Sequence, residues 1–263
     1  MISFARGRFS KVMPLAGAPF AGAAIPLARN GPVDLSTEME ELWRSLGPAN
    51  PGRGRVVQFI GAMGGEGVST IAREFAFCAA QRAKKPVWLV DLDLFKAGQQ
   101  AAVAKEARRY GELGAAAAAS PDGSVFFAVE PAAANAEGLQ RPQSRYLSAR
   151  PAASGRMWVT RFHAEALVPG QSVTVSRWPA YWNALRKHAE YIVIDAPAAD
   201  RSTAALTLAP LADVNIMVVA AEAGDAREPA ALKAAVEEAG GSIAGLVFNR
   251  AEARPPAFLQ SLV

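Results

Sequence analysis

Residues 56–70, VVQFIGAMGGEGVST, decide the fold that this sequence predicts. Four of the first five residues are apolar, as in a short buried strand, and residues 61–67 form a glycine-rich turn. Ser69 and Thr70 then open a predicted helix that runs to about residue 84. Strand, glycine-rich turn and helix in this order are typical of an anion-binding loop. The glycines let backbone N–H groups turn towards an anion at the positive end of the helix.

The rest of the chain repeats the alternation of strand and helix. Further strands are predicted where apolar residues run together, at 87–91, 191–194, 214–219 and 243–248. Helices are predicted at 36–46, 178–190 and 225–239. Strands that are apolar on both faces must be covered on both. We therefore expect an α/β fold, a doubly wound, mostly parallel sheet with helices on both faces.

A single α/β domain is expected to span residues 34–263. Within it, residues 111–155 interrupt the alternation with an alanine run and four prolines. They predict a partly irregular insertion at the rim of the sheet. Strand-like pieces are expected at 125–129 and 157–162.

The net charge lies in the first part of the chain. The 263 residues include 28 Lys and Arg and 24 Asp and Glu, a net charge of +4, and residues 1–33 contain four basic residues and no acidic one. The remainder is formally neutral, which argues against a nucleic-acid-binding face. We expect residues 1–33 to be a flexible basic tail. The alternatives are a tether to an anionic membrane surface and a secretory signal.

Cysteine and histidine are rare. One cysteine and two histidines exclude a disulfide framework and a metal site built from these residues, and they favour a reducing, cytoplasmic compartment. Prolines interrupt the longest uncharged stretch, so no transmembrane helix is predicted.

Polar side chains follow the predicted strands. Asp91 and Asp93 come at the end of the strand at 87–91, Asp195 follows the strand at 191–194, and Asn249 follows the last strand. Beside a bound phosphate, Ser69 would ligate Mg²⁺ directly and Asp195 would hold it through water. The plain alternatives are that the carboxylates cap loops, that the hydroxyls cap the helix and that Asn249 forms a turn.

The predicted loop lacks its usual cation. A phosphate-binding loop of the type GxxxxGK[ST] has lysine where this sequence has Val68. Losing one charged hydrogen bond weakens phosphate binding by about 1.5–3 kcal/mol. Losing one preorganised donor slows a reaction by about 10²- to 10³-fold. Lys84 and Lys85 lie ~20 Å away along the helix, and no other basic residue is expected near the loop.

The motifs resemble those of the deviant-Walker MinD/ParA group of P-loop ATPases. Within this group they are most similar to bacterial tyrosine autokinases (BY-kinases), which control exopolysaccharide export. The family motifs PGEGKST, hhhDxDxR and hhhDxPP are matched by GGEGVST (64–70), VWLVDLDLF (87–95) and IVIDAPA (192–198). Phe95 stands in place of the arginine in the second motif.

Two further features carry the resemblance. Asn249 stands where relatives often place an asparagine against adenine. Glu41 and Arg44 match two of the three positions of the family's oligomerisation motif ExxRxxR. The similarity covers about 35–105 and 178–250 and does not extend to the segment between them.

The resemblance implies a P-loop NTPase-like fold with a weak or vestigial nucleotide site. The implied site residues are Gly64, Gly65, Gly67, Ser69, Thr70, Asp91, Asp93, Asp195 and Asn249. Ser69 and Asp195 would hold Mg²⁺ if nucleotide binds. No firmly bound cofactor is expected, ATP or ADP with Mg²⁺ would bind weakly, and no catalytic residue is assigned. Glu41 and Arg44 are assigned to self-association into a homo-oligomer.

The departures from the family predict a loss of activity. Val68 replaces the loop lysine, Met63 replaces the second lysine of MinD and ParA relatives, and residues 250–263 contain no tyrosine to phosphorylate. We predict a catalytically impaired BY-kinase-like pseudo-enzyme, a regulatory or scaffolding partner in exopolysaccharide biosynthesis and export. It would be cytoplasmic and peripheral to the inner membrane, docked on the cytoplasmic part of a membrane polysaccharide co-polymerase. One alternative is an active MinD/ParA-like ATPase with an atypical loop in polysaccharide secretion or pilus assembly; another is a MinD-type organiser that binds membrane directly.

Overall fold

One mixed sheet organises the protein. The computed structural model describes residues 9–14, 34–47, 49, 52–133, 139–221 and 226–251. In these ranges the main sheet has the strand order β1-β11-β10-β2-β9-β3-β7-β6-β4. Its strands are β1 (Phe9–Pro14), β2 (Arg55–Ile60), β3 (Val87–Asp91), β4 (Ala117–Ala118), β6 (Leu147–Ala152), β7 (Met157–Phe162), β9 (Tyr191–Asp195), β10 (Val214–Ala220) and β11 (Ile243–Ala251). A separate pair is formed by β5 (Phe127–Glu130) and β8 (Ser172–Val175).

The central strands are parallel and the edges are antiparallel. The six strands from β11 to β7 pair in parallel, with β2 between β10 and β9. At one edge β1 pairs antiparallel with β11, and at the other β6 and β4 continue antiparallel from β7. The predicted doubly wound, mostly parallel sheet is confirmed.

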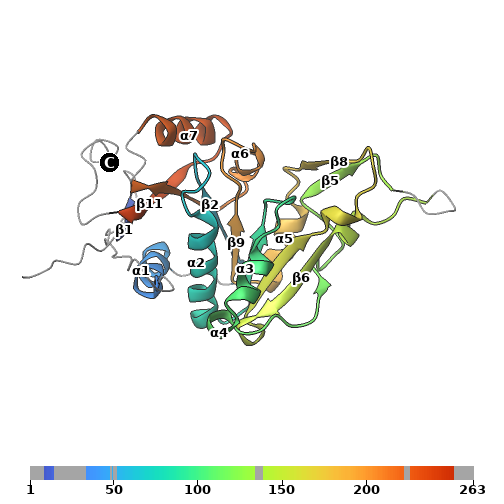
Figure 1. The fold of residues 1–263 in the computed structure, drawn as a ribbon, viewed down its shortest axis with the longest axis horizontal. Coiled ribbons are helices and arrows are strands. Elements are labelled where there is room, and N and C mark those ends of the chain that lie inside the picture. Colours follow the sequence, from blue (N-terminus) through green and yellow to red (C-terminus); the bar gives the residue numbers. More distant parts are fainter. Residues whose placement is uncertain are drawn as a thin grey trace, which may run out of the picture.

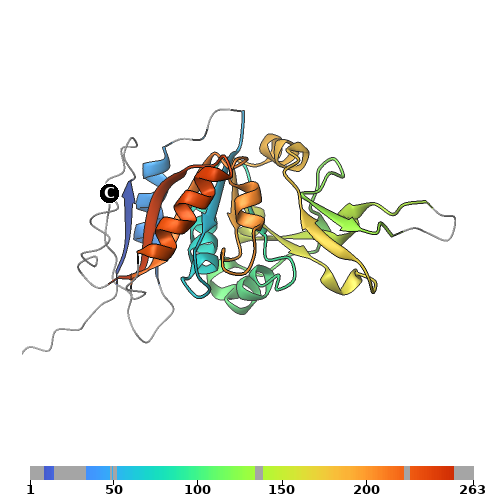
Figure 2. The same ribbon diagram turned by 90° about the horizontal axis from the view of Figure 1, so that it is seen from above.

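Helices cover both faces of the sheet. They are α1 (Ser36–Leu46), α2 (Val68–Arg82), α3 (Gln99–Lys105), α4 (Ala107–Tyr110), α5 (Ala180–His188), α6 (Ala204–Leu208) and α7 (Arg227–Glu238), together with the short 3₁₀ turns η1 (Gln143–Tyr146), η2 (Ala153–Gly155) and η3 (Ala164–Ala166). Two buried cores result, one with α1 to α4 and one with α5 to α7. Figures 1 and 2 show α1 and α2 on the opposite side of the sheet from α6 and α7.

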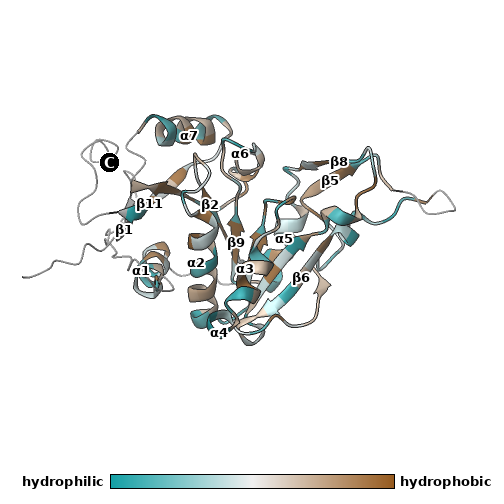
Figure 3. Cartoon of the chain, viewed as in Figure 1, coloured by the Kyte–Doolittle hydropathy of each residue, from teal (hydrophilic) through white to brown (hydrophobic). Residues whose placement is uncertain are grey.

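The sequence of β2 explains why both faces are covered. Val56 and Ile60 belong to the core under α5 to α7, whereas Val57 and Phe59 belong to the core under α1 to α4. Successive side chains of a strand point to opposite faces, so an apolar run needs a layer on each side. The hydropathy colouring in Figure 3 accordingly marks the central strands as hydrophobic, while the helices carry both kinds of residue.

The two ends of the molecule are built differently. β5 and β8 lie at the end far from β1 and β11 in both views (Figures 1 and 2). Beneath them, aromatic rings pack edge to face or tilted, with Phe126 5.0 Å from Tyr181 and 5.4 Å from Trp182 between ring centroids. Trp178, which precedes this cluster in sequence, is exposed instead.

Residues 9–14 correct the expectation of a wholly flexible tail. They form β1, because the outer edge of β11 offers backbone groups that an extended segment satisfies by antiparallel pairing. Residues 111–155 contain β4, β5 and β6, two of which extend the rim of the main sheet. No helix in the described ranges is long and apolar enough to cross a membrane.

Candidate functional site

The glycine-rich loop lies at the carboxyl end of β2 and leads directly into α2. Gly65 and Gly67 adopt φ angles of +91° and +92°, a conformation that favours glycine, and Gly67 is the residue that precedes the helix. A Cβ on Gly67 would lie 2.0 Å from Nδ2 of Asn249. Gly67 is therefore required both by its backbone angle and by this close approach.

Asn249 braces the loop from inside β11. Its Nδ2 donates to the carbonyl of Glu66 at 2.8 Å. The side chain thus contacts a loop that is more than 180 residues away in sequence. Asn249 lies within β11, so the alternative prediction that it forms a turn is wrong. The contact with adenine implied by the family resemblance stays a prediction.

The start of α2 presents backbone donors. The N–H groups of Thr70 and Ile71 both donate to the Gly67 carbonyl at 3.0 Å. For the N–H groups of residues 65–69, no acceptor is found in the described part of the chain. Gly64, Gly65 and Ser69 are exposed, so these donors lie near solvent. The N-cap position is occupied by Gly67, which has no side chain to cap the helix, so Ser69 and Thr70 lie inside the helix and are not plain caps. Free N–H groups at a helix start are suited to bind phosphate oxygens.

Two side chains of the loop point into the protein. The Glu66 carboxylate accepts the Met63 N–H at 2.9 Å, and burial raises the pKa of this carboxyl. Val68 is 7 % exposed and belongs to the core under α1 to α4. The position that bears lysine in an intact phosphate-binding loop is thus part of the hydrophobic packing here.

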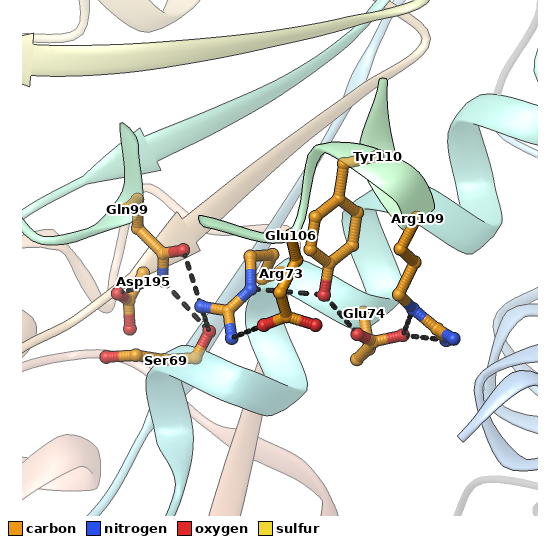
Figure 4. Close-up of polar contacts among 8 residues, drawn as sticks. All are labelled: Ser69, Arg73, Glu74, Gln99, Glu106, Arg109, Tyr110 and Asp195. Carbon is orange, nitrogen blue, oxygen red and sulfur yellow. Dashed lines mark hydrogen bonds and ion pairs between the residues drawn. The ribbon is translucent and has the colours of Figure 1, made fainter. Parts of the chain in front are cut away.

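Parallel pairing brings the predicted carboxylates together. Asp91 and Asp195 are register partners at the ends of β3 and β9. Asp195 Oδ2 accepts from Gln99 Nε2 at 2.6 Å, and the nearby Ser69 side chain opposes the rise in the pKa of this carboxyl. Asp91 Oδ2 accepts the Gln99 N–H at 2.9 Å. Ser69 and Asp195, the two predicted Mg²⁺ ligands, therefore lie near each other in the folded protein (Figure 4).

The two carboxyl groups are held in an unfavourable environment for charge. Burial raises the pKa of Asp91, and the nearby Asp195 carboxylate raises it further. Burial also raises the pKa of Asp195, whose Oδ1 atom is buried without a hydrogen-bond partner in the described residues. A buried acceptor of this kind fits a cation and its water. No group of three or more His, Cys, Asp or Glu that could bind a metal occurs in the same ranges, so phosphate and water oxygens would have to complete the shell.

Gln99, which the sequence reading missed, connects the parts of the site. Its Nε2 donates to the Ser69 carbonyl at 2.9 Å as well as to Asp195. Its Oε1 accepts from Arg73 Nη1 at 3.1 Å. Figure 4 shows the Gln99 amide directed toward both Asp195 and Ser69. Gln99 therefore hydrogen-bonds the carboxylate of Asp195, one predicted Mg²⁺ ligand, and the backbone carbonyl of Ser69, whose hydroxyl is the other.

A buried ionic network extends from Gln99 along α2. Arg73 Nε donates to the Tyr110 hydroxyl at 3.2 Å, and that hydroxyl donates to Glu74. Arg109 Nη2 pairs with Glu74 at 2.5 Å (Figure 4). The sequence signal for this network was the pair of charged residues, Arg73 and Glu74, inside the otherwise apolar stretch 71–80 of α2.

Arg201 corrects the expectation that no further basic residue lies near the loop. A Cβ on Gly64 would lie 3.8 Å from Arg201 Nε. The Arg201 guanidinium is 3.6 Å from Asp93 Oδ2, and Asp200 Oδ2 accepts the Gly64 N–H at 3.2 Å. Arg201 therefore lies between Asp93 and the glycine-rich loop, and no sequence motif had indicated this arginine.

The predicted self-association residues lie outside this site. Arg44 is exposed and pairs with Glu40 at 2.5 Å on α1. The partner of Arg44 on the helix is thus Glu40 at i−4 and not Glu41 at i−3. Phe95, at the position of the family's arginine, is 68 % exposed.

Comparison with known proteins gives a limited result. No protein-family model and no curated protein matches the sequence. Several solved structures match the fold, among them the crystal structure of the VpsO kinase domain. It is 19 % identical, with a TM-score of 0.48, and the alignment covers 75 % of this chain and 85 % of that chain.

Proposed function

We propose that this chain is a catalytically impaired, BY-kinase-like P-loop protein that serves as a regulatory or scaffolding partner in exopolysaccharide biosynthesis and export. One observation carries the loss of activity. The loop keeps its shape and its free N–H groups, while the position of its cation, Val68, is buried in the core. The link to exopolysaccharide rests on the motif resemblance.

In this proposal each part of the site has a role. The N–H groups of residues 65–69 bind the phosphates of ATP or ADP. Ser69 and Asp195 are the residues that would hold Mg²⁺, which neutralises phosphate charge when bound. Without lysine, nucleotide binding is weaker by about 1.5–3 kcal/mol, and the rate of phosphoryl transfer is lower by about 10²- to 10³-fold.

The interactions of the protein follow from the same proposal. It docks on the cytoplasmic part of a membrane polysaccharide co-polymerase, so it is cytoplasmic and peripheral to the inner membrane. It forms a homo-oligomer through Glu41 and Arg44 on α1. The exposed position of Arg44 supports this role.

An active ATPase with an atypical loop is the second candidate. Arg201 favours it, because its guanidinium lies beside Gly64 and could take over part of the task of the missing lysine. The two candidates differ in one measurable property, the rate of phosphate release.

The test compares the full chain with two variants, Val68→Lys and Asp195→Asn. Calorimetric titration with ATP and Mg²⁺ should give an affinity that Val68→Lys increases by about 10- to 100-fold. Phosphate release and autophosphorylation of the natural sequence should not exceed those of Asp195→Asn, which keeps the shape of the site. Release that Asp195→Asn abolishes would favour the active ATPase. Equal affinity of Val68→Lys and the natural sequence would refute the role of the missing lysine.

A further inference from the structure

The segment after β9 is fastened to the glycine-rich loop. The N–H of Ala199 donates to the Gly61 carbonyl at 2.9 Å, and the N–H of Asp200 donates to the Ala62 carbonyl at 3.1 Å. In return, the Gly64 N–H donates to Asp200 Oδ2 at 3.2 Å. Three hydrogen bonds between the same two segments fix the position of the next residue, Arg201, relative to the loop.

The side chain of Arg201 is near the loop and lightly held. Its Nε is 3.8 Å from the position that a Cβ on Gly64 would take. Its ion pairs are long, 3.6 Å to Asp93 and 3.9 Å to Asp200, and 49 % of the side chain is exposed. Ion pairs longer than a hydrogen bond on an exposed side chain contribute little, so the guanidinium is available to a stronger anion.

Space for a ligand adjoins the guanidinium. A cavity of about 360 Å³ is lined by Arg201 and Asp93 together with the hydroxyl residues Ser202, Thr203 and Thr207. Apolar residues at the ends of β3 and β8 complete its wall. The cavity therefore leaves room for an anionic group beside the Arg201 guanidinium.

Another basic residue near the site is already engaged. Arg73 is 8 % exposed, and its guanidinium donates to Gln99 and Tyr110 and lies 3.9 Å from Glu106. Moving it towards the loop would leave a buried network without its cation, which is costly. Among the described residues, Arg201 belongs to no buried hydrogen-bond network of this kind.

We propose that Arg201 supplies the positive charge that Val68 cannot, by binding the terminal phosphate of a nucleotide in the loop. A guanidinium offers several N–H donors in one plane and pairs with two phosphate oxygens at once. The charge thus comes from the segment after β9 and not from α2. This inference rests on the proposed nucleotide site, and it predicts that ATP binds more tightly than AMP.

The test is calorimetric titration of the full chain with ATP and Mg²⁺, with AMP as the comparison. Arg201→Ala should weaken ATP binding by about tenfold or more and leave AMP binding unchanged. Arg161→Ala is the matched control, because Arg161, on β7, is 43 % exposed and pairs with Glu165. It should bind ATP like the natural sequence. Thermal unfolding without ligand checks that both variants fold.

A double variant separates the inference from the proposed site. In Val68→Lys the loop has its own cation, so adding Arg201→Ala should weaken ATP binding much less than it does in the natural sequence. If neither the natural sequence nor Val68→Lys binds ATP, the nucleotide site itself is wrong. If the natural sequence binds ATP and Arg201→Ala binds it equally well, only the role of Arg201 is overturned. The role of Arg201 alone is also overturned if Val68→Lys binds ATP and the natural sequence does not.

Discussion

Replacing Gln99 by alanine should destabilise the protein far more than the same change at Gln100. Both side chains are buried amides at the start of α3. The Gln99 amide makes three hydrogen bonds, to Asp195 Oδ2 at 2.6 Å, to the Ser69 carbonyl at 2.9 Å and from Arg73 at 3.1 Å. The Gln100 amide donates to the Val159 carbonyl at 2.8 Å.

The expected difference follows from the kind of partner. A hydrogen bond to a charged group contributes about 1.5–3 kcal/mol and one to a neutral group about 0.5–1.5 kcal/mol. Gln99 has two charged partners and one neutral partner, and water that enters the emptied space recovers part of the loss. We expect Gln99→Ala to lower the free energy of unfolding by roughly 3–5 kcal/mol and Gln100→Ala by roughly 1–2 kcal/mol. The cavity contribution is similar in both, because the same atoms are removed.

Urea unfolding at pH 7, followed by circular dichroism, measures both variants against the natural sequence. The melting temperature of Gln99→Ala should fall by roughly 10 °C. Removing the amide also frees the Asp195 carboxylate, so ATP with Mg²⁺ should raise the melting temperature of this variant more than that of the natural sequence.

Equal destabilisation by Gln99→Ala and Gln100→Ala would refute this reasoning. It would mean that the contacts of Gln99 with Asp195 and Arg73 contribute no more than a single bond to a backbone carbonyl. A ligand-induced rise no larger than that of the natural sequence would refute the second part, that Gln99 competes with Mg²⁺.

Three further changes test other parts of the structure. Gly67→Ala should lower stability by at least about 1 kcal/mol in urea unfolding, because the new Cβ meets Asn249 and the φ angle is positive; a neutral effect would contradict this geometry. Because the pKa of Asp91 is raised in the folded protein, the native state keeps a proton on this carboxyl at pH values where the unfolded chain has lost it. The stabilisation that this proton gives is complete below about pH 4 and is lost as the pH rises through the pKa of the folded state. Asp195→Asn removes the neighbouring charge and should reduce the loss of stability between pH 5 and pH 8; an unchanged slope would count against the coupling. Arg44→Ala should lower the oligomeric mass in light scattering, and an unchanged mass would exclude a role of Arg44 in self-association.

Local patterns predicted the framework of the site. The apolar run of β2, the glycine-rich turn and the helix after it lie next to one another in sequence, so their order alone indicated where backbone donors would gather. Parallel strands end at one edge of a sheet, and this places Asp91 beside Asp195 once both are read as strand ends. Helix α1 was predicted with its observed bounds because its apolar residues repeat at helical spacing.

The residues that complete the site could not be predicted in this way. Gln99 reaches Asp195 across 96 positions, and Arg201 reaches the loop from a segment with no periodic pattern. β1 likewise depends on an edge of β11 that only the assembled sheet provides.

The sequence by itself determined the layers, the loop and the missing cation, because each depends on residues that are neighbours along the chain. Only the tertiary structure decided which side chains occupy the space around the loop. Those contacts join segments that are far apart in sequence. Whether such segments meet depends on the conformation of the loops between them, which the spacing of neighbouring residues does not determine.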